Sequence, residues 1–353
     1  MEYLKSIDDP LTKINENNII YFDLFDYPDL VFGNPFQTDK VNFCKYDENV
    51  QKEMEEEGGF VHKTMQQFKS CTCGNRIRFK TTSRRLILKV EFSEPYYHKN
   101  MLLYNSSGFD VYIIDDDGKY HNYSLIATKE GIRTFAKYIA IPPNSSVCIF
   151  LPNYCSIKRM LIGLDNGSKI YKLKYPKANE LPILFYGNSI TQGASASKSG
   201  NSFPNIVSRK LDNDIINLSM VTCCRGTPKT AEMIGNIKCK AIVIDYSRYA
   251  PNIEFLRNTH EKFYRKIREK HPDIKIIIMT AASFNEWKEY VAYDEVIIQT
   301  YENAIARGEN TLLLNQSELF DYEDYDLVSI DIGHYTDYGM YKIADKLCEL
   351  LTL

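Results

Sequence analysis

The second half of the chain alternates short apolar segments with longer helical ones, and this rhythm constrains the fold more than any other feature. The apolar segments are Ile183–Gly187, Ile215–Leu218, Ala241–Tyr246, Ile274–Thr280 and Thr311–Asn315. The clearest helical patterns cover Asn252–Lys270 and Tyr338–Leu351. Strands that alternate with helices predict an α/β domain, a parallel sheet with helices on both faces. Sites in such sheets form at the carboxyl ends of the strands.

The first half has a different pattern, with many short strand-like segments between turns. Arg76–Lys80 alternates strictly, and Leu86–Phe92 is mostly apolar. Turn signals such as Asp117-Gly118 and Asn166-Gly167 separate the segments. This pattern predicts an antiparallel β-sandwich or jelly roll. The charged stretch 45–70 is expected to be a surface excursion.

A linker at Lys174–Pro182 divides the two halves. We therefore predict two domains, 1–177 and 178–353. The chain is 44% hydrophobic and 25% charged, which suits a globular protein with sizeable cores.

Charge and cysteine content exclude several classes of function. The net charge of −3 provides no basic face for nucleic acid. No run of about 18 apolar residues is present, so no membrane span is predicted. The polar start lacks the apolar core of a signal peptide, and the nine cysteines are expected to be reduced thiols in a cytoplasm. Cys71 and Cys73 lack a second pair at metal-ligand spacing, so neither metal nor cofactor is predicted.

The segment Gly187–Gly193, GNSITQG, follows the first strand of the second half. A serine on a tight strand-to-helix turn projects its hydroxyl above the sheet, and its backbone N–H points to the same space. That arrangement suits attack on a carbonyl and stabilisation of the resulting oxyanion. Ser189 is the candidate nucleophile. A phosphate-cradling glycine loop and a plain turn are the alternatives at this point.

A second motif, Asp331-Ile332-Gly333-His334, precedes the final helix. A carboxylate three residues before a histidine can hold its Nδ1–H, which leaves Nε2 to accept a proton from serine. Thr336 or Asp337 is expected to cap the last helix. Capping does not need His334, so both roles fit one segment.

Together these motifs resemble the SGNH (GDSL-like) hydrolase family, which has G-x-S after its first strand and D-x-x-H before its last helix. The resemblance is close to a branch that reads GSSITQG where this chain reads GNSITQG. That branch also has an N-terminal β-sandwich with a G-x-D-L-Y motif, which Gly108–Tyr112 matches as GFDVY. The resemblance implies a three-layer, flavodoxin-like hydrolase domain behind a β-sandwich.

The resemblance also assigns site residues. It implies that Ser189 is the nucleophile, His334 the base and Asp331 the third triad member. The oxyanion hole of the family comes from the nucleophile N–H, a glycine N–H after the second strand and an asparagine side chain after the third.

Two positions depart from that pattern. Thr222 replaces the oxyanion glycine, and a β-branched residue resists positive φ, so a displaced loop is expected. Tyr249 stands where relatives carry the asparagine. Its phenol can donate one hydrogen bond from a longer side chain, and loss of such a donor typically costs about 2.7–4 kcal/mol. Ser189, Thr222 and Tyr249 are the predicted oxyanion hole.

Three further residues are predicted to contact substrate: Asn188, Arg225 and Trp287. Arg225 has a counterpart in the matching family loop, and a structural ion pair is its rival role. Trp287, the only tryptophan, suits stacking on a sugar ring or acyl chain, or anchoring of a loop.

We predict a serine esterase that acts on small acyl esters. The resemblance implies that its substrates are acetyl esters of carbohydrates. A relative that binds acylated sugars without turnover and an acyltransferase remain alternatives. The expected partner is a small acylated saccharide, with no nucleic acid or membrane, and the oligomeric state is open.

Overall fold

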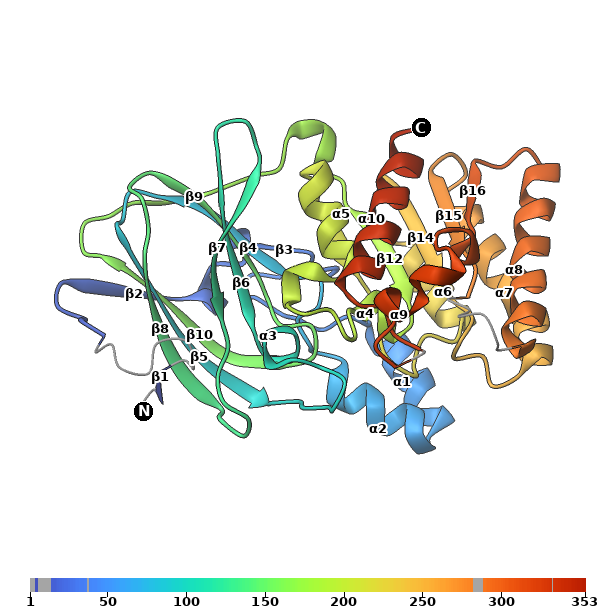
Figure 1. The fold of residues 1–353 in the computed structure, drawn as a ribbon, viewed down its shortest axis with the longest axis horizontal. Helices are drawn as coiled ribbons and strands as arrows, with labels where there is room; N and C mark the ends of the chain where they lie inside the picture. Colours follow the sequence, from blue (N-terminus) through green and yellow to red (C-terminus); the bar gives the residue numbers. More distant parts are fainter. Residues whose placement is uncertain (1–3, 6–13, 37, 282–287, 332) are drawn as a thin grey trace.

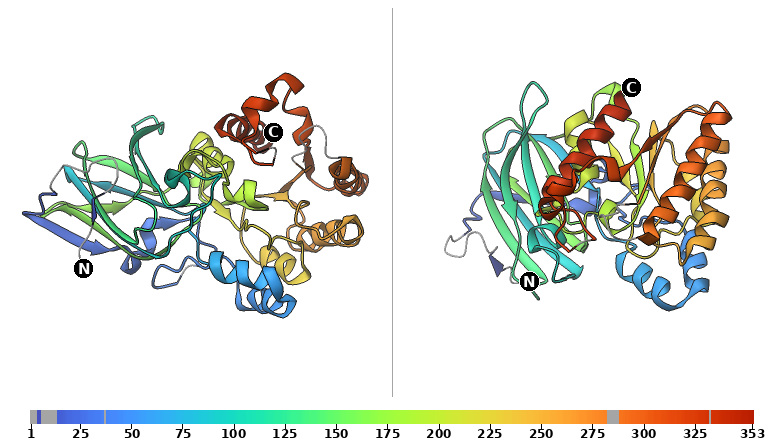
Figure 2. Two further views of the ribbon diagram at one scale, coloured as in Figure 1. Left: turned by 60° about the horizontal axis from the view of Figure 1, so that its bottom comes forward. Right: turned by 45° about the vertical axis from the view of Figure 1, so that its right-hand side comes forward.

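The computed structural model describes residues 4–5, 14–36, 38–281, 288–331 and 333–353. Strands dominate one end of the molecule and helices the other (Figure 1). The N-terminal strands and the parallel C-terminal sheet lie in separate parts of the molecule, as the turned views also show (Figure 2). This architecture confirms the predicted fold class.

The C-terminal sheet has five parallel strands in the order β13-β12-β14-β15-β16. They are β12 (Ile183–Gly187), β13 (Ile215–Asn217), β14 (Ala241–Asp245), β15 (Lys275–Met279) and β16 (Thr311–Leu314). This is the flavodoxin-like order 2-1-3-4-5. The five predicted segments match these strands to within one residue at either end.

Helices cover both faces of this sheet. They are α5 (Phe203–Leu211), α6 (Pro228–Gly235), α7 (Ile253–Lys270), α8 (Lys288–Ala306) and α10 (Asp337–Thr352). Ile183 and Phe185 of β12 share a core with α5 and α10, whereas Leu184 and Tyr186 share one with α6 and α7. Alternate residues of a central strand are thus buried on opposite faces, which explains its continuous apolar sequence.

The N-terminal half holds two sheets around a second core. One sheet has the order β1-β8-β5-β10-β2, formed by Leu4–Lys5, Thr134–Ala140, Arg85–Glu94, Ser156–Asp165 and Ile19–Asp23. The other has the order β11-β4-β9-β6-β7, with β3 beside β4. Its strands are β3 (Val31–Phe32), β4 (Arg76–Thr81), β6 (Phe109–Ile114), β7 (Tyr120–Ile126), β9 (Ser145–Phe150) and β11 (Ile170–Lys172). The pairings are antiparallel except that of β1 with β8. The domain limits 1–177 and 178–353 remain a prediction.

Short helices complete the fold. They are α3 (Leu103–Ser106), α4 (Ser189–Gln192), α9 (Tyr325–Val328), and the 3-10 turns Leu24–Asp26, Pro28–Leu30, Lys177–Asn179, Ser199–Asn201, Gln316–Glu318 and Tyr322–Asp324.

The stretch 45–70 is not the surface excursion that its charge suggested. It forms α1 (Glu48–Glu57) and α2 (Gly59–Phe68), which lie under the C-terminal sheet domain in Figure 1. Val50 and Met54 are one helical turn apart, and both are buried in the core that contains α6 and α7. The expectation was wrong because apolar residues one helical turn apart give these charged helices a buried face.

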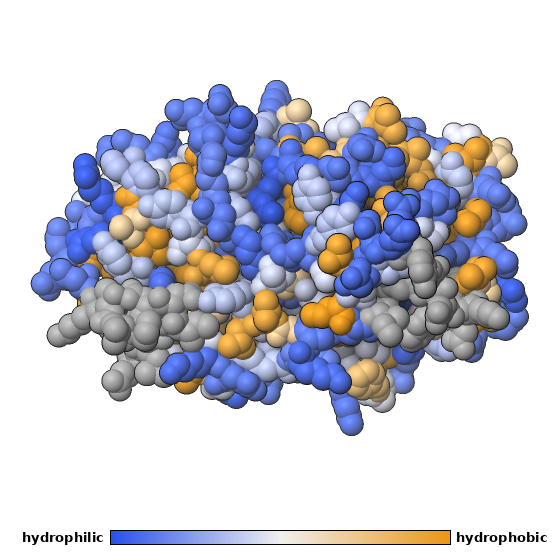
Figure 3. Space-filling model, in the orientation of Figure 1, coloured by the Kyte–Doolittle hydropathy of each residue, from blue (hydrophilic) through white to orange (hydrophobic). Residues whose placement is uncertain are grey.

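On the face shown in Figure 3 the described residues are mainly hydrophilic, with apolar residues in small separate groups. Among the described residues, no helix is long and apolar enough to cross a membrane.

Candidate active site

Ser189 is the first residue of α4, directly beyond the carboxyl end of β12. The turn before it is tight: a Cβ on Gly187 would lie 2.4 Å from Thr191 Oγ1. The Asn188 side chain caps α4 by accepting a hydrogen bond from the Ile190 N–H at 2.8 Å. Glycine and asparagine therefore form the sharp turn that presents the serine hydroxyl.

The structure brings together the three predicted triad residues. Ser189 Oγ lies 3.0 Å from His334 Nε2, and His334 Nδ1 lies 2.9 Å from Asp331 Oδ2. Asp331 Oδ1 also accepts the backbone N–H groups of Gly333 and His334, at 3.1 and 2.8 Å. This geometry lets Nε2 accept the serine proton while the carboxylate orients the ring.

Asn100 is a site residue that sequence reasoning missed. It comes from the loop after β5, in the N-terminal half, and its Nδ2 donates to Asp331 Oδ2 at 2.8 Å. Its own carbonyl accepts a hydrogen bond from Ser195 Oγ at 3.0 Å. Partial burial raises the pKa of Asp331, but hydrogen bonds from Asn100 and His334 outweigh it and lower the pKa below its ordinary value. Asp331 therefore stays ionised.

A second unpredicted contact fixes the histidine loop. Arg248, in the loop after β14, donates through Nη1 to the carbonyl of Gly333 at 2.8 Å. The loop after β14 thus positions the residue next to His334.

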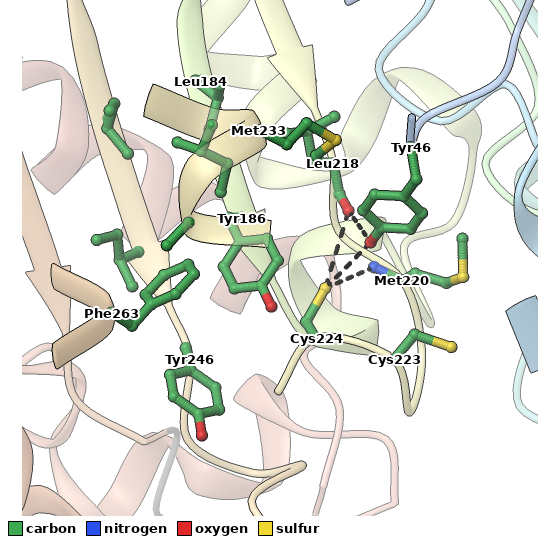
Figure 4. Packing of buried hydrophobic residues seen from close by; sticks show 14 of the residues in the cluster. Tyr46, Leu184, Tyr186, Leu218, Met220, Cys223, Cys224, Met233, Tyr246 and Phe263 are labelled. Atoms are coloured by element: carbon green, nitrogen blue, oxygen red, sulfur yellow. Dashed lines mark hydrogen bonds between the residues drawn. The ribbon is translucent and has the colours of Figure 1, made fainter. Parts of the chain in front are cut away.

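Thr222 adopts φ 66°, the left-handed conformation that favours glycine, and displacement of the loop stays a prediction. Neighbouring contacts hold this strained conformation. The Val221 N–H donates to Gln192 Oε1 at 2.8 Å, and Cys224 Sγ accepts the Met220 N–H at 3.3 Å. Figure 4 shows Cys224 inside the core beside Tyr46. These contacts fix the backbone of the loop and offset the cost of the strained conformation of Thr222, about 1–3 kcal/mol.

The Tyr249 hydroxyl lies in the candidate oxyanion hole. The backbone N–H groups of Ser189 and Thr222 and the side chain of Ser189 lie near enough to the phenol to lower its pKa. Burial raises the pKa of the phenol above its ordinary value, and these groups partly oppose that rise. The three predicted oxyanion residues therefore lie close together.

The three predicted substrate contacts have different outcomes. Asn188 is buried, and its Nδ2 donates to Asp245 Oδ2 at 2.9 Å, so its amide bonds within the protein. Arg225 is paired with Glu57 of α1 and donates to the carbonyl of Thr222 at 3.3 Å, the structural ion pair weighed as its rival role. Trp287 lies outside the described residues. Substrate contact by all three remains a prediction.

Asp245 is a buried carboxyl group behind the site. It accepts hydrogen bonds from Thr191 Oγ1 at 2.5 Å and from Asn188. Burial raises its pKa to about 7, despite these hydrogen bonds. In the described part of the chain, no group of three or more His, Cys, Asp or Glu residues is placed to hold a metal ion.

A serine, histidine and aspartate in this geometry at the strand ends of a flavodoxin-like sheet define a serine-hydrolase-like protein. Family models agree with that class. Residues 180–352 match the GDSL-like Lipase/Acylhydrolase family, and residues 19–170 match the N-terminus of Esterase_SGNH_hydro-type. The chain belongs to the SGNH (GDSL-like) hydrolase family, in the branch with the G-x-D-L-Y N-terminal region. No curated protein sequence matches the chain.

Solved structures share the fold over nearly the whole chain. A protein described as a GDSL-like lipase from Bacteroides ovatus superimposes with a TM-score of 0.80 at 23% identity, covering 95% of this chain and 98% of its own. The salicylyl-acyltransferase SsfX3 from a tetracycline biosynthetic pathway gives 0.77 at 16% identity, covering 96% and 98%. A family two carbohydrate esterase from Cellvibrio japonicus gives 0.59 at 14%, covering 94% and 97%.

Proposed function

We propose that this protein is a serine esterase that hydrolyses small acyl esters, with acetyl esters of carbohydrates as its substrate class. The single observation that carries the proposal is the continuous contact from Ser189 Oγ to His334 Nε2 at 3.0 Å, and from His334 Nδ1 to Asp331 at 2.9 Å. Membership of the esterase family supports the reaction type. The carbohydrate esterase neighbours support the choice of a saccharide.

In the proposed reaction Ser189 Oγ attacks the ester carbonyl while His334 Nε2 takes its proton. The bond from the carbonyl carbon to the alcohol oxygen then breaks, and His334 returns the proton to the leaving alcohol. A water molecule then attacks the carbonyl carbon of the acyl-enzyme while His334 takes its proton. The bond to Ser189 Oγ breaks, and His334 returns the proton to the serine oxygen. Asp331, held by Asn100, keeps the imidazole oriented and stabilises its positive charge.

The oxyanion would form opposite the N–H groups of Ser189 and Thr222, and the Tyr249 hydroxyl lies near both groups in the free protein. The substrate carbonyl must therefore displace the phenol before attack. The displaced hydroxyl then lies at the edge of the hole, where it can donate one hydrogen bond.

Covalent labelling tests the nucleophile directly. A fluorophosphonate probe should phosphonylate Ser189 Oγ with loss of fluoride, and peptide mass spectrometry should place the label there. Ser189→Ala should abolish labelling, whereas Ser195→Ala, which removes a nearby serine, should keep it. Label on another residue, or labelling that survives Ser189→Ala, would overturn the assignment.

An acyltransferase is the second candidate, because the salicylyl-acyltransferase SsfX3 shares the fold over both halves. The acyl-enzyme is common to both reactions, and only the acceptor differs. Product analysis with an acyl donor in the presence of saccharide alcohols distinguishes them: free acid supports the esterase, and an acylated acceptor as the main product supports the transferase.

A binding protein without turnover is the remaining alternative. The observation that favours it is the phenol in the oxyanion hole. Saccharide-ester binding with no difference in hydrolysis between wild type and Ser189→Ala would support it.

A further inference from the structure

Lys45 lies in an unusual place for a lysine. It precedes α1, and only 2% of it is exposed. Its Nζ donates to the carbonyl of Ser219 at 2.8 Å. The charged groups that interact with it are the thiols of Cys71 and Cys73, both also buried. A buried ammonium requires a compensating charge, and here the compensating groups are sulfur atoms.

Lys45 donates a short hydrogen bond to Cys73. Nζ lies 2.6 Å from Cys73 Sγ. An ordinary N–H···O bond spans about 2.9–3.0 Å, and sulfur is larger than oxygen. The two atoms are thus at a separation that one bridging atom would span.

The two thiols also share an ionised form beside the ammonium. Burial raises the pKa of both, but hydrogen bonds from Cys73 and Lys45 outweigh it for Cys71 and lower its pKa to about 6. The pKa of Cys73 is raised. The pair therefore shares one negative charge beside the ammonium. A thiolate is the form of cysteine that reacts with oxidants.

We propose that Lys45 and Cys73 are the site of an oxidative crosslink, in which a single oxygen atom joins Nζ to Sγ. The co-reactant is dioxygen. One of its oxygen atoms becomes the bridge and the other leaves as water. The O–O bond, the thiol S–H bond and one amine N–H bond break, while S–O and N–O bonds form. Sulfur and nitrogen each give up two electrons, and dioxygen takes up all four.

The crosslink would lie directly behind the oxyanion loop. Lys45 Nζ contacts Ser219, and Cys71 Sγ accepts a hydrogen bond from Gln192 Nε2 at 3.5 Å. The other end of Gln192 holds the Val221 N–H beside Thr222. Bridge formation removes the buried ammonium from this network. The effect of the bridge on catalysis rests on the proposed function, whereas the crosslink itself does not.

Peptide mass spectrometry of the full-length protein tests the proposal. After purification without reductant and incubation in air-saturated buffer, the peptide with Lys45 should be joined to the peptide with Cys73. The joined mass should equal the sum of the two peptides plus one oxygen minus two hydrogens. Dithiothreitol should release both. Fluorophosphonate labelling of Ser189 is independent of this result, so the two proposals fail separately.

Variants provide the controls. Lys45→Met and Cys73→Ser should lose the joined peptide, and Cys239→Ser, which removes a different buried thiol, should keep it. Reduction should also lower the Tm of the wild type and leave that of Lys45→Met unchanged. A Cys71–Cys73 disulfide, oxygen acids on either thiol with Lys45 free, or no oxidised species in the wild type would overturn the proposal.

Discussion

The Tyr249 hydroxyl lies near the backbone N–H of Thr222, which opposes the rise in the pKa of the phenol that burial causes. In the proposed mechanism, this aromatic side chain lies where the oxyanion of a substrate would form. Thr222 adopts a left-handed backbone conformation despite its β-branch. In the proposed mechanism, each encounter with substrate includes displacement of a phenol.

We predict that Tyr249→Asn raises kcat/KM, because the hole is emptied and a shorter donor is restored. One oxyanion donor is worth about 100- to 1000-fold in rate, so an increase of at least tenfold is expected in steady-state ester hydrolysis. Tyr246→Phe, which removes a phenol hydroxyl outside the hole, is the control and should change little. An unchanged or lower rate for Tyr249→Asn would show that the phenol does not obstruct the reaction.

We predict that Asn100→Ala lowers kcat/KM about tenfold, with little loss of stability. A hydrogen bond to a charged group is worth about 1.5–3 kcal/mol, and its loss lets Asp331 and the imidazole move. Lys99→Ala, at the exposed neighbouring position, should behave as wild type. Equal rates for the two variants would show that Asn100 does not contribute to catalysis.

We predict that Thr222→Gly keeps the rate and does not destabilise the fold. Relief of the left-handed strain, about 1–2 kcal/mol, offsets the greater chain entropy of glycine, about 0.5–1 kcal/mol. Val221→Gly should lower the Tm, because Val221 is not among the residues with positive φ. A clear fall in Tm for Thr222→Gly would contradict the strained conformation.

We predict a pH-dependent stability difference between the wild type and Asp245→Asn. Burial raises the folded-state pKa of Asp245 to about 7, from an ordinary value of about 3.9. Between these values the folded state holds a proton that the unfolded state has lost, so the contribution of Asp245 falls as pH rises.

Urea unfolding at several pH values measures this contribution. The free energy of unfolding of the wild type, relative to Asp245→Asn, should decrease from about pH 4 to about pH 7. Asp116→Asn, at an exposed turn, should show the same pH dependence as the wild type. Parallel curves for the wild type and Asp245→Asn would contradict the raised pKa.

Much of this structure was predictable from local sequence. β12 matches its predicted segment at both ends because a strand buried on two faces has an uninterrupted apolar sequence. Ser189 and His334 were predictable because each lies in a short motif at an element boundary. The closure of the triad to hydrogen-bonding distance follows from both motifs lying at the same edge of the sheet.

Long-range contacts were not predictable. Asn100 meets Asp331 across 231 positions, and no local pattern marks an asparagine in a polar loop. The position of the Tyr249 hydroxyl depends on side-chain direction, which the motif comparison did not provide. The role of 45–70 was misinterpreted because mean charge concealed apolar residues one helical turn apart, such as Val50 and Met54.

The most direct test of the central claim is release of p-nitrophenol from p-nitrophenyl acetate by the wild type beside Ser189→Ala, with both proteins checked for folding by circular dichroism. The proposed mechanism predicts turnover by the wild type, and loss of turnover in Ser189→Ala to the background rate. Equal rates for the two folded proteins, whether high or absent, would contradict the assignment of Ser189 as the nucleophile of an esterase.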